Sequence, residues 1–260
     1  MTQFVCLSGL PRSGSTVLSA LLSQNPVIHA EGNSAVCQLM WDMNLSCTHN
    51  VTEQLKANNR EYTIRDLVVQ VPNTYYRNVP RGTKVIIDKC RAWTLPANVE
   101  LLRKYIDPQI KFIVLERPVT DVFKSFAKLY KKNEWSEKFS RECLNDMLKH
   151  ESEPIMRSLK GMTDAKASTD ANKTFLFIQY DDLIKDPKGT LERIYAFCGW
   201  AAFDHTFTNI ENKHHENDDS YNLKGFHDIR ATISKEPNAT VLPPDVAEKC
   251  KQIDTFLGYL

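Results

Sequence analysis

The chain has 260 residues, and its 33 lysines and arginines nearly balance 32 aspartates and glutamates, so the formal net charge is +1. A hydrophobic fraction of 42% and a charged fraction of 25% are typical of a globular protein with a substantial core. The balanced charge argues against a protein that binds nucleic acid or a membrane surface through excess basic residues. No apolar run approaches the roughly 18 residues that a membrane span needs. We therefore expect no nucleic-acid partner and no stable membrane insertion.

The first residues and the cysteines indicate the cellular compartment. Residues 4–7 form a short apolar run without the basic flank of a signal peptide, which predicts a strand. The seven cysteines are odd in number and include no Cys-x-x-Cys pair, so we expect reduced, packed thiols. Together these features predict a cytoplasmic protein. The oligomeric state stays open.

Apolar strand-like runs alternate with helical patterns along the chain. Strands are expected at residues 4–7, 85–87, 110–115 and 175–178, and helices at residues 17–22, 96–105, 118–129, 187–198 and 244–258. Asp186 is expected to cap the fourth of these helices, and Gly199 to end it. The alternation predicts an α/β fold with a central, P-loop-like parallel sheet and helices on both faces.

We expect residues 1–260 to form one domain. Residues 33–80 are predicted to be mainly helical and to form a cap over the sheet. Residues 201–245 are predicted to be irregular and to cover the cofactor or the acceptor.

A glycine-containing loop between the first strand and the first helix is the strongest local motif, Gly9-Leu10-Pro11-Arg12-Ser13-Gly14-Ser15-Thr16. Glycines let successive backbone amides point at one anion, and the helix N-terminus adds partial positive charge. A nucleotide-hydrolysing P-loop has a lysine at the position of Ser15, and its absence argues against ATP or GTP hydrolysis. Arg12 and the neighbouring hydroxyls instead predict an oxyanion site. A strand–helix joint without a ligand is the alternative.

This loop resembles the 5′-phosphosulfate loop of sulfotransferases that use 3′-phosphoadenosine 5′-phosphosulfate (PAPS). In that family a strand ending in Arg, followed eight residues later by Ser, holds the 3′-phosphate; here Phe112–Arg117 and Ser125 match. By themselves, Arg117 and Ser125 would suggest a surface salt bridge and a helix serine. The resemblance implies that they bind the 3′-phosphate, and that the 5′-phosphosulfate is held by Arg12, Ser13, Gly14, Ser15 and Thr16.

Two further segments resemble the same family. Ile178–Leu183 is similar to the segment whose tyrosine approaches the adenine, which implies that role for Tyr180. A packing role at the strand end is the alternative for this tyrosine. Residues 221–230 look like a segment of bacterial sulfotransferase-like proteins that closes over the cofactor, which makes Arg230 a further phosphate ligand. Lys128, near the Arg/Ser motif, is another candidate.

The candidate catalytic residues also follow from the resemblance. Glu31 occupies the position at which the tyrosylprotein branch has its catalytic glutamate. The phenol branch has a Lys-Thr-His motif, whereas this chain has Lys89-Cys90-Arg91 and lacks the histidine. The resemblance therefore implies that Glu31 accepts the acceptor's proton, and that Lys89 and Arg12 stabilise the leaving phosphate oxygen. A helix-capping carboxylate and a sheet-edge salt bridge are the alternatives for Glu31 and Lys89.

The implied reaction is direct transfer of a sulfuryl group from PAPS to a hydroxyl or amine of an unidentified acceptor, with adenosine 3′,5′-bisphosphate (PAP) as product. No metal is expected, and His214, His215 and Glu216 are expected in a solvated loop. One alternative is a small-molecule or nucleotide kinase with a degenerate P-loop, in which Asp181 and Asp182 would be the acidic pair. Another is a catalytically silent nucleotide-binding protein of the same fold.

Overall fold

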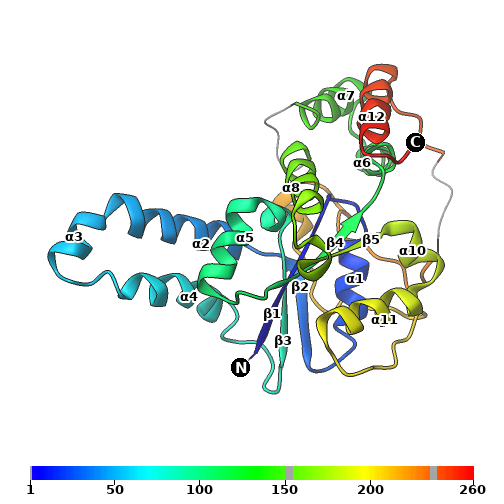
Figure 1. Cartoon of the computed structure of the whole chain (residues 1–260). Coiled ribbons are helices and arrows are strands. Elements are labelled where there is room, and N and C mark those ends of the chain that lie inside the picture. Colours follow the sequence, from blue (N-terminus) through cyan, green and yellow to red (C-terminus); the bar gives the residue numbers. More distant parts are fainter. Residues whose placement is uncertain (1, 150–154, 235–238) are drawn as a thin grey trace.

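A five-stranded parallel sheet lies at the centre of the computed structural model, which describes residues 2–149, 155–234 and 239–260 (Figure 1). The neighbouring strands all pair in parallel, in the order β2-β3-β1-β4-β5. The predicted α/β fold is therefore confirmed. The strands are β1 (Gln3–Gly9), β2 (Ile28–Asn33), β3 (Val85–Lys89), β4 (Lys111–Glu116) and β5 (Phe175–Gln179).

Strand β2 is the one strand of this sheet that the sequence pattern does not predict. It lies at the edge and pairs only with β3, where Ala30 faces Ile87 and Asn33 faces Lys89 after a shift of register. An edge strand has one neighbour only and part of it faces solvent, so it tolerates polar residues that a central strand would not. The polar end of β2 thereby comes to lie beside the end of β3.

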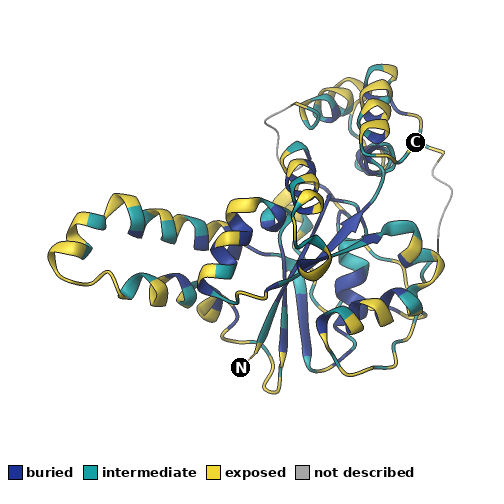
Figure 2. Ribbon diagram, viewed as in Figure 1, coloured by how far each residue is buried: buried dark blue, intermediate teal, exposed yellow. Residues whose placement is uncertain are grey.

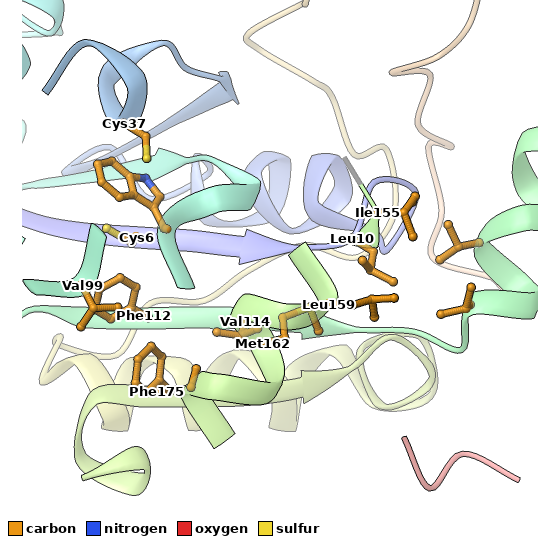
Figure 3. Close-up of a cluster of buried hydrophobic side chains, with 14 of the residues drawn as sticks. Cys6, Leu10, Cys37, Val99, Phe112, Val114, Ile155, Leu159, Met162 and Phe175 are labelled. Atoms are coloured by element: carbon orange, nitrogen blue, oxygen red, sulfur yellow. The ribbon is translucent and has the colours of Figure 1, made fainter. Parts of the chain in front are cut away.

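Helices cover both faces of the sheet, as predicted. Side chains of β4 alternate between two buried clusters: Phe112 and Val114 pack on one face, and Ile113 and Leu115 on the other (Figure 3 shows the first cluster). Figure 2 shows that buried residues concentrate on the strands and on the helix surfaces that face them. The helices are α1 (Ser15–Leu22), α5 (Pro96–Tyr105), α6 (Val119–Lys132), α7 (Glu137–Asp146), α8 (Met156–Ala167), α9 (Ala171–Thr174), α10 (Tyr180–Lys185), α11 (Pro187–Cys198) and α12 (Pro244–Phe256).

Helix α11 has the boundaries that its sequence signals predict. The Asp186 carboxylate accepts a hydrogen bond of 2.9 Å from the Gly189 amide. Gly199 ends the helix in the left-handed conformation, with φ of 72°. Local capping chemistry was enough to predict this helix.

The segment predicted to form a cap is helical, and the base of this segment packs in the same buried cluster as residues of the sheet. Helices α2 (Val36–Leu45), α3 (Thr52–Ala57) and α4 (Thr63–Tyr75), with the short helix η1 (Ser46–Asn50), form an arm that projects from the body of the molecule (Figure 1). Helices α2 and α4 pack against each other along this arm. The described residues between α11 and α12 are mostly irregular and include one short helix, η3 (Asp218–Tyr221).

Candidate active site

The loop between β1 and α1 has an unusual backbone that depends on glycine. Arg12 and Gly14 adopt left-handed conformations, with φ of 63° and 96°. A Cβ atom on Gly14 would lie 2.8 Å from the ring of Tyr180, so this position admits only glycine without a shift of the tyrosine. The loop thus bends tightly and packs against the start of α10. It lies at the carboxyl ends of the strands, where open α/β sheets bind their ligands.

A cavity of about 860 Å³ opens at this edge of the sheet. Its walls come from the β1–α1 loop, the end of β3, helix α6 and residues 225–234. Most of the predicted site residues line this one cavity, namely Arg12, Gly14, Ser15, Thr16, Lys89, Arg117, Ser125, Lys128, Tyr180 and Arg230. Ser13 is fully buried within the loop. The structure therefore brings together residues that are far apart in the sequence.

The first loop and the Arg/Ser motif are in direct contact. Arg12 Nε donates a hydrogen bond of 3.1 Å to Ser125 Oγ, and the Arg12 guanidinium also donates to the carbonyl oxygen of Phe226. Arg117 donates a bond of 2.7 Å to the Arg12 carbonyl oxygen, and its guanidinium lies 4.2 Å from the centre of the Tyr180 ring. Burial lowers the pKa of Arg12, and the neighbouring charge of Arg117 lowers it further. Two adjacent guanidinium groups favour an anion between them.

Two buried polar atoms of this region have no hydrogen-bond partner among the described residues. They are Ser13 Oγ in the loop and Arg117 Nε at the end of β4. Buried polar atoms are nearly always hydrogen-bonded, so an unpaired donor beside a cavity is a candidate contact for a ligand. Arg117 lines the cavity, whereas Ser13 is fully buried and does not.

Lys89 is held by a carboxylate that the sequence analysis did not identify. Its Nζ donates a hydrogen bond of 2.9 Å to Glu216 Oε2, and the two side chains are only 9% and 12% exposed. The second oxygen of Glu216 accepts a 2.9 Å bond from the Asn33 amide. A Cβ atom on Gly32 would collide with the Glu216 side chain. The close approach of Glu216 to the end of β2 therefore requires glycine at position 32.

Burial shifts the pKa values of Lys89 and Glu216, and the ion pair between them counteracts this shift to a different extent for each residue. Burial lowers the pKa of Lys89, and the charge of Glu216 opposes this lowering only in part. Burial also acts to raise the pKa of Glu216, but Lys89 and the Asn33 amide outweigh it, so the pKa lies below its usual value. The pairing therefore favours the charged form of both groups against the effect of burial.

His227 extends this contact network into the cavity. Its Nδ1 lies 2.6 Å from Asp218 Oδ1, and its backbone amide donates to Asp218 Oδ2 at 3.3 Å. Its Nε2 lies 3.3 Å from the Glu216 oxygen that Lys89 contacts. Burial lowers the pKa of His227, against the effect of the two carboxylates. The side chain lines the cavity.

The prediction of a solvated loop around residues 214–216 is wrong for two of its three members. Glu216 pairs with Lys89, and the His214 ring packs 4.7 Å from the ring of His29; His215 alone is exposed. Asp218 and His227 were also missed. The only signal was the resemblance of residues 221–230 to a cofactor-covering segment, which does not single out a histidine.

Glu31 lies apart from the other predicted site residues. It is on β2 with its Oε2 atom 3.0 Å from His29 Nε2, and its side chain is 31% exposed. It is not among the residues that line the cavity. Its catalytic role stays a prediction.

Buried carboxylates fix the elements that carry the site. Asp88, next to Lys89, accepts hydrogen bonds of 2.6–2.7 Å from Ser34, Tyr76 and Trp93. Burial raises the pKa of Asp88 although these three donors act to lower it. The group therefore ties the end of β3 to the residue after β2, to the end of α4 and to the segment that follows β3.

A second carboxylate, Asp254 of α12, caps helix α6. Its two oxygens accept bonds of 2.6 Å and 2.9 Å from the amides of Val119 and Thr120. Helix α6 carries Ser125 and Lys128, so the cap holds the helix that supplies one wall of the cavity.

The acidic pair Asp181 and Asp182, the possible metal ligands and the cysteines bear on the other functions considered from the sequence. Asp181 and Asp182 begin α10 and do not line the cavity. Within residues 2–149, 155–234 and 239–260, no group of three His, Cys, Asp or Glu side chains could hold a metal ion, and no helix is long and apolar enough to cross a membrane. The seven cysteines are free thiols.

Comparison with known proteins decides the family. Residues 5–205 match the model of the sulfotransferase family. The chain belongs to the sulfotransferase family. No curated protein sequence gives a match.

Solved sulfotransferase structures share the fold. The sulfotransferase domain from the curacin biosynthetic pathway is 16% identical with a TM-score of 0.61, over 100% of this chain and 98% of that chain. The sulfotransferase from Alicyclobacillus acidocaldarius is 15% identical with a TM-score of 0.54, over 100% and 92%. The sulfotransferase domain from the Synechococcus PCC 7002 olefin synthase is 18% identical with a TM-score of 0.51, over 97% and 94%. Identities this low establish the fold, and the family rests on the sequence model.

Proposed function

We propose that this sulfotransferase moves a sulfuryl group from PAPS to a hydroxyl or amine acceptor. The observation that carries the proposal is the bond from Arg12 to Ser125, which joins two motifs 113 residues apart at one cavity. PAPS has anionic groups at both ends of its nucleotide, so it needs two anion sites on a single surface. The unpaired Nε atom of Arg117, a residue that lines the cavity, supports this assignment.

The residues fit the two ends of the nucleotide. When bound, PAPS supplies the sulfuryl group and PAP is its leaving group. The amides at the start of α1 and the loop hydroxyls would donate to the 5′-phosphosulfate. Arg12 also bonds Ser125, and this contact supports a role for Arg12 at the 3′-phosphate in addition to the loop. The 5′ group would be held by Arg12, Ser13, Gly14, Ser15 and Thr16, the 3′-phosphate by Arg117 and Ser125 with Lys128 and Arg230 near it, and the adenine side by Tyr180.

Lys89 is the cation that we assign to the transfer step. Its buried ammonium would stabilise negative charge that develops on the phosphate oxygen as the sulfur–oxygen bond breaks. Such preorganised charge is worth more in a cavity than in water. Glu31 is the proton acceptor implied by the family resemblance, and its hydrogen bond to His29 is the contact through which it would be oriented.

A kinase is the second candidate, and the site favours it less. Ser15 stands where a kinase P-loop has its lysine, and the Asp181–Asp182 pair is outside the cavity lining. A catalytically silent member of the family would keep the nucleotide site but lose turnover.

Calorimetric titration with PAP, AMP and ATP·Mg²⁺ tests the proposal. PAP should bind far more tightly than AMP, since AMP lacks the 3′-phosphate. Arg117→Ala should weaken PAP binding about 10- to 100-fold, from the loss of charge-assisted hydrogen bonds, and should weaken AMP binding less. Arg193→Ala, at an exposed arginine of α11, is the matched control. Equal losses for PAP and AMP would refute two separate sites, and a preference for ATP·Mg²⁺ would favour the kinase.

A further inference from the structure

His227 has an orienting partner of the kind that general bases use. The Asp218 carboxylate contacts it twice, through Nδ1 at 2.6 Å and through the backbone amide at 3.3 Å. A carboxylate at Nδ1 fixes the proton on that nitrogen and leaves Nε2 as the basic atom. The bond from the backbone amide also holds the Asp218 carboxylate beside the ring. An ordinary surface histidine has no such constraint.

His227 lies close to Lys89, the residue that we assign to the transfer step. Its side chain lines the same cavity as Lys89 and the phosphate loop. Its Nε2 and Lys89 Nζ lie within 3.3 Å and 2.9 Å of the same oxygen, Glu216 Oε2, so the basic nitrogen and the cation are neighbours. An acceptor that reaches the sulfur beside Lys89 would therefore pass within reach of Nε2.

The charged groups around His227 suit a neutral imidazole that gains a proton during the reaction. The groups that face it are Glu216, Asp218 and Lys89. Burial lowers its pKa and favours the neutral imidazole, and the two carboxylates oppose this effect and would pair with the protonated form. Glu31 has a different setting, because its carboxylate contacts His29 and does not line the cavity.

We propose that His227 is the proton acceptor of the reaction, oriented by Asp218, and that Glu216 holds Lys89 beside it. This inference rests on the proposed function. His227 Nε2 takes the proton of the acceptor hydroxyl or amine as the new bond to sulfur forms. The bond from sulfur to the bridging phosphate oxygen breaks, and PAP leaves with that electron pair. The imidazolium, balanced by Asp218, then gives its proton to water.

The first test compares turnover with binding. Consumption of ³⁵S-labelled PAPS, with water or an added acceptor taking the sulfuryl group, reports transfer whatever the natural acceptor is. His227→Asn should lower the rate about 10²- to 10⁴-fold, which is the usual contribution of a general base. PAP affinity should change less than threefold. His215→Asn, at the exposed histidine of the same segment, is the matched control and should keep the wild-type rate.

Three further readouts separate a catalytic role from a structural one. Added imidazole should restore part of the turnover of His227→Gly. The acid limb of the wild-type rate profile should disappear in His227→Asn. In ¹⁵N-labelled protein, the neutral ring should carry its proton on Nδ1, and Asp218→Asn should shift the proton toward Nε2. This last measurement needs no activity.

The outcomes distinguish the inference from the proposed function. A wild type that turns over PAPS while His227→Asn keeps its rate within threefold overturns the role of His227 alone. A larger loss in Glu31→Gln than in His227→Asn overturns it too, in favour of Glu31. A wild type that binds no PAP overturns the proposed function, and with it this inference.

Discussion

Removing the carboxylate of Glu216 should destabilise the protein more than any exposed charge change in the same segment. In Glu216→Gln, the buried ammonium of Lys89 loses its partner, and both side chains are about 90% shielded from solvent, at 9% and 12% exposure. Breaking a buried ion pair on one side typically costs about 3–5 kcal/mol. The amide oxygen of glutamine can still accept from Asn33, so we expect about 3 kcal/mol. A fall in Tm of about 6–12 °C follows for a chain of this size.

The pH dependence of this loss has a defined sign. Without Glu216, burial acts unopposed on Lys89, and its folded-state pKa falls further below the unfolded value. Between the two pKa values the unfolded chain binds more protons, so the stability of the variant rises with pH. The difference in unfolding free energy between wild type and Glu216→Gln should therefore become smaller from pH 7 to pH 9.5. In the wild type, the lowered pKa of Glu216 gives stability that is present above its unfolded pKa and lost as pH falls through the folded value.

Urea unfolding at several pH values measures both effects. Glu211→Gln, at an exposed glutamate of the same segment, is the control and should change stability by less than about 0.5 kcal/mol. The double variant Lys89→Met, Glu216→Gln should recover part of the loss, because no unpaired charge remains buried. A loss below about 0.5 kcal/mol in Glu216→Gln, or a loss that does not depend on pH, would refute the reasoning.

Two other substitutions test how the site is held. Asp254→Ala removes the cap of α6 and should lower the free energy of unfolding in urea by about 1–2 kcal/mol. Because α6 carries Ser125, PAP affinity should also fall. An unchanged affinity would show that the position of the helix does not depend on the cap. Gly14→Ala places a methyl group against the ring of Tyr180 and should lower the free energy of unfolding by about 1–3 kcal/mol. Calorimetry should also show weaker PAP binding. A variant with wild-type stability and affinity would contradict the tight packing of the loop.

The sequence predicts the parts of the fold whose signals are local. Four strands are apolar runs, interrupted only by Lys111 in the third of them, and the caps at Asp186 and Gly199 lie beside the helix that they bound. Strand β2 was missed because its polar half at residues 31–33 reads as a loop, and only pairing with β3 makes it a strand. The arm of residues 36–75 was predicted as helical, but its direction depends on tertiary packing.

In the candidate site too, local motifs could be predicted from the sequence, whereas contacts between distant residues could not. The loop between β1 and α1 and the Arg/Ser motif are contiguous patterns, so the sequence alone was enough to propose them as site segments. The contact of Glu216 with Lys89 joins residues 127 apart, and no periodicity or spacing indicates it. Asp254 caps α6 from 135 residues away, which is equally invisible in the sequence.

The most direct test of the central claim follows two labels in parallel. The protein is incubated with ³⁵S-labelled PAPS and a mixture of small hydroxyl and amine compounds, and in a second reaction with [γ-³²P]ATP·Mg²⁺ and the same mixture. The account predicts that ³⁵S leaves the nucleotide while PAP accumulates, that Lys89→Met slows this transfer, and that ³²P stays on ATP. Transfer of ³²P with ³⁵S retained on PAPS would contradict it.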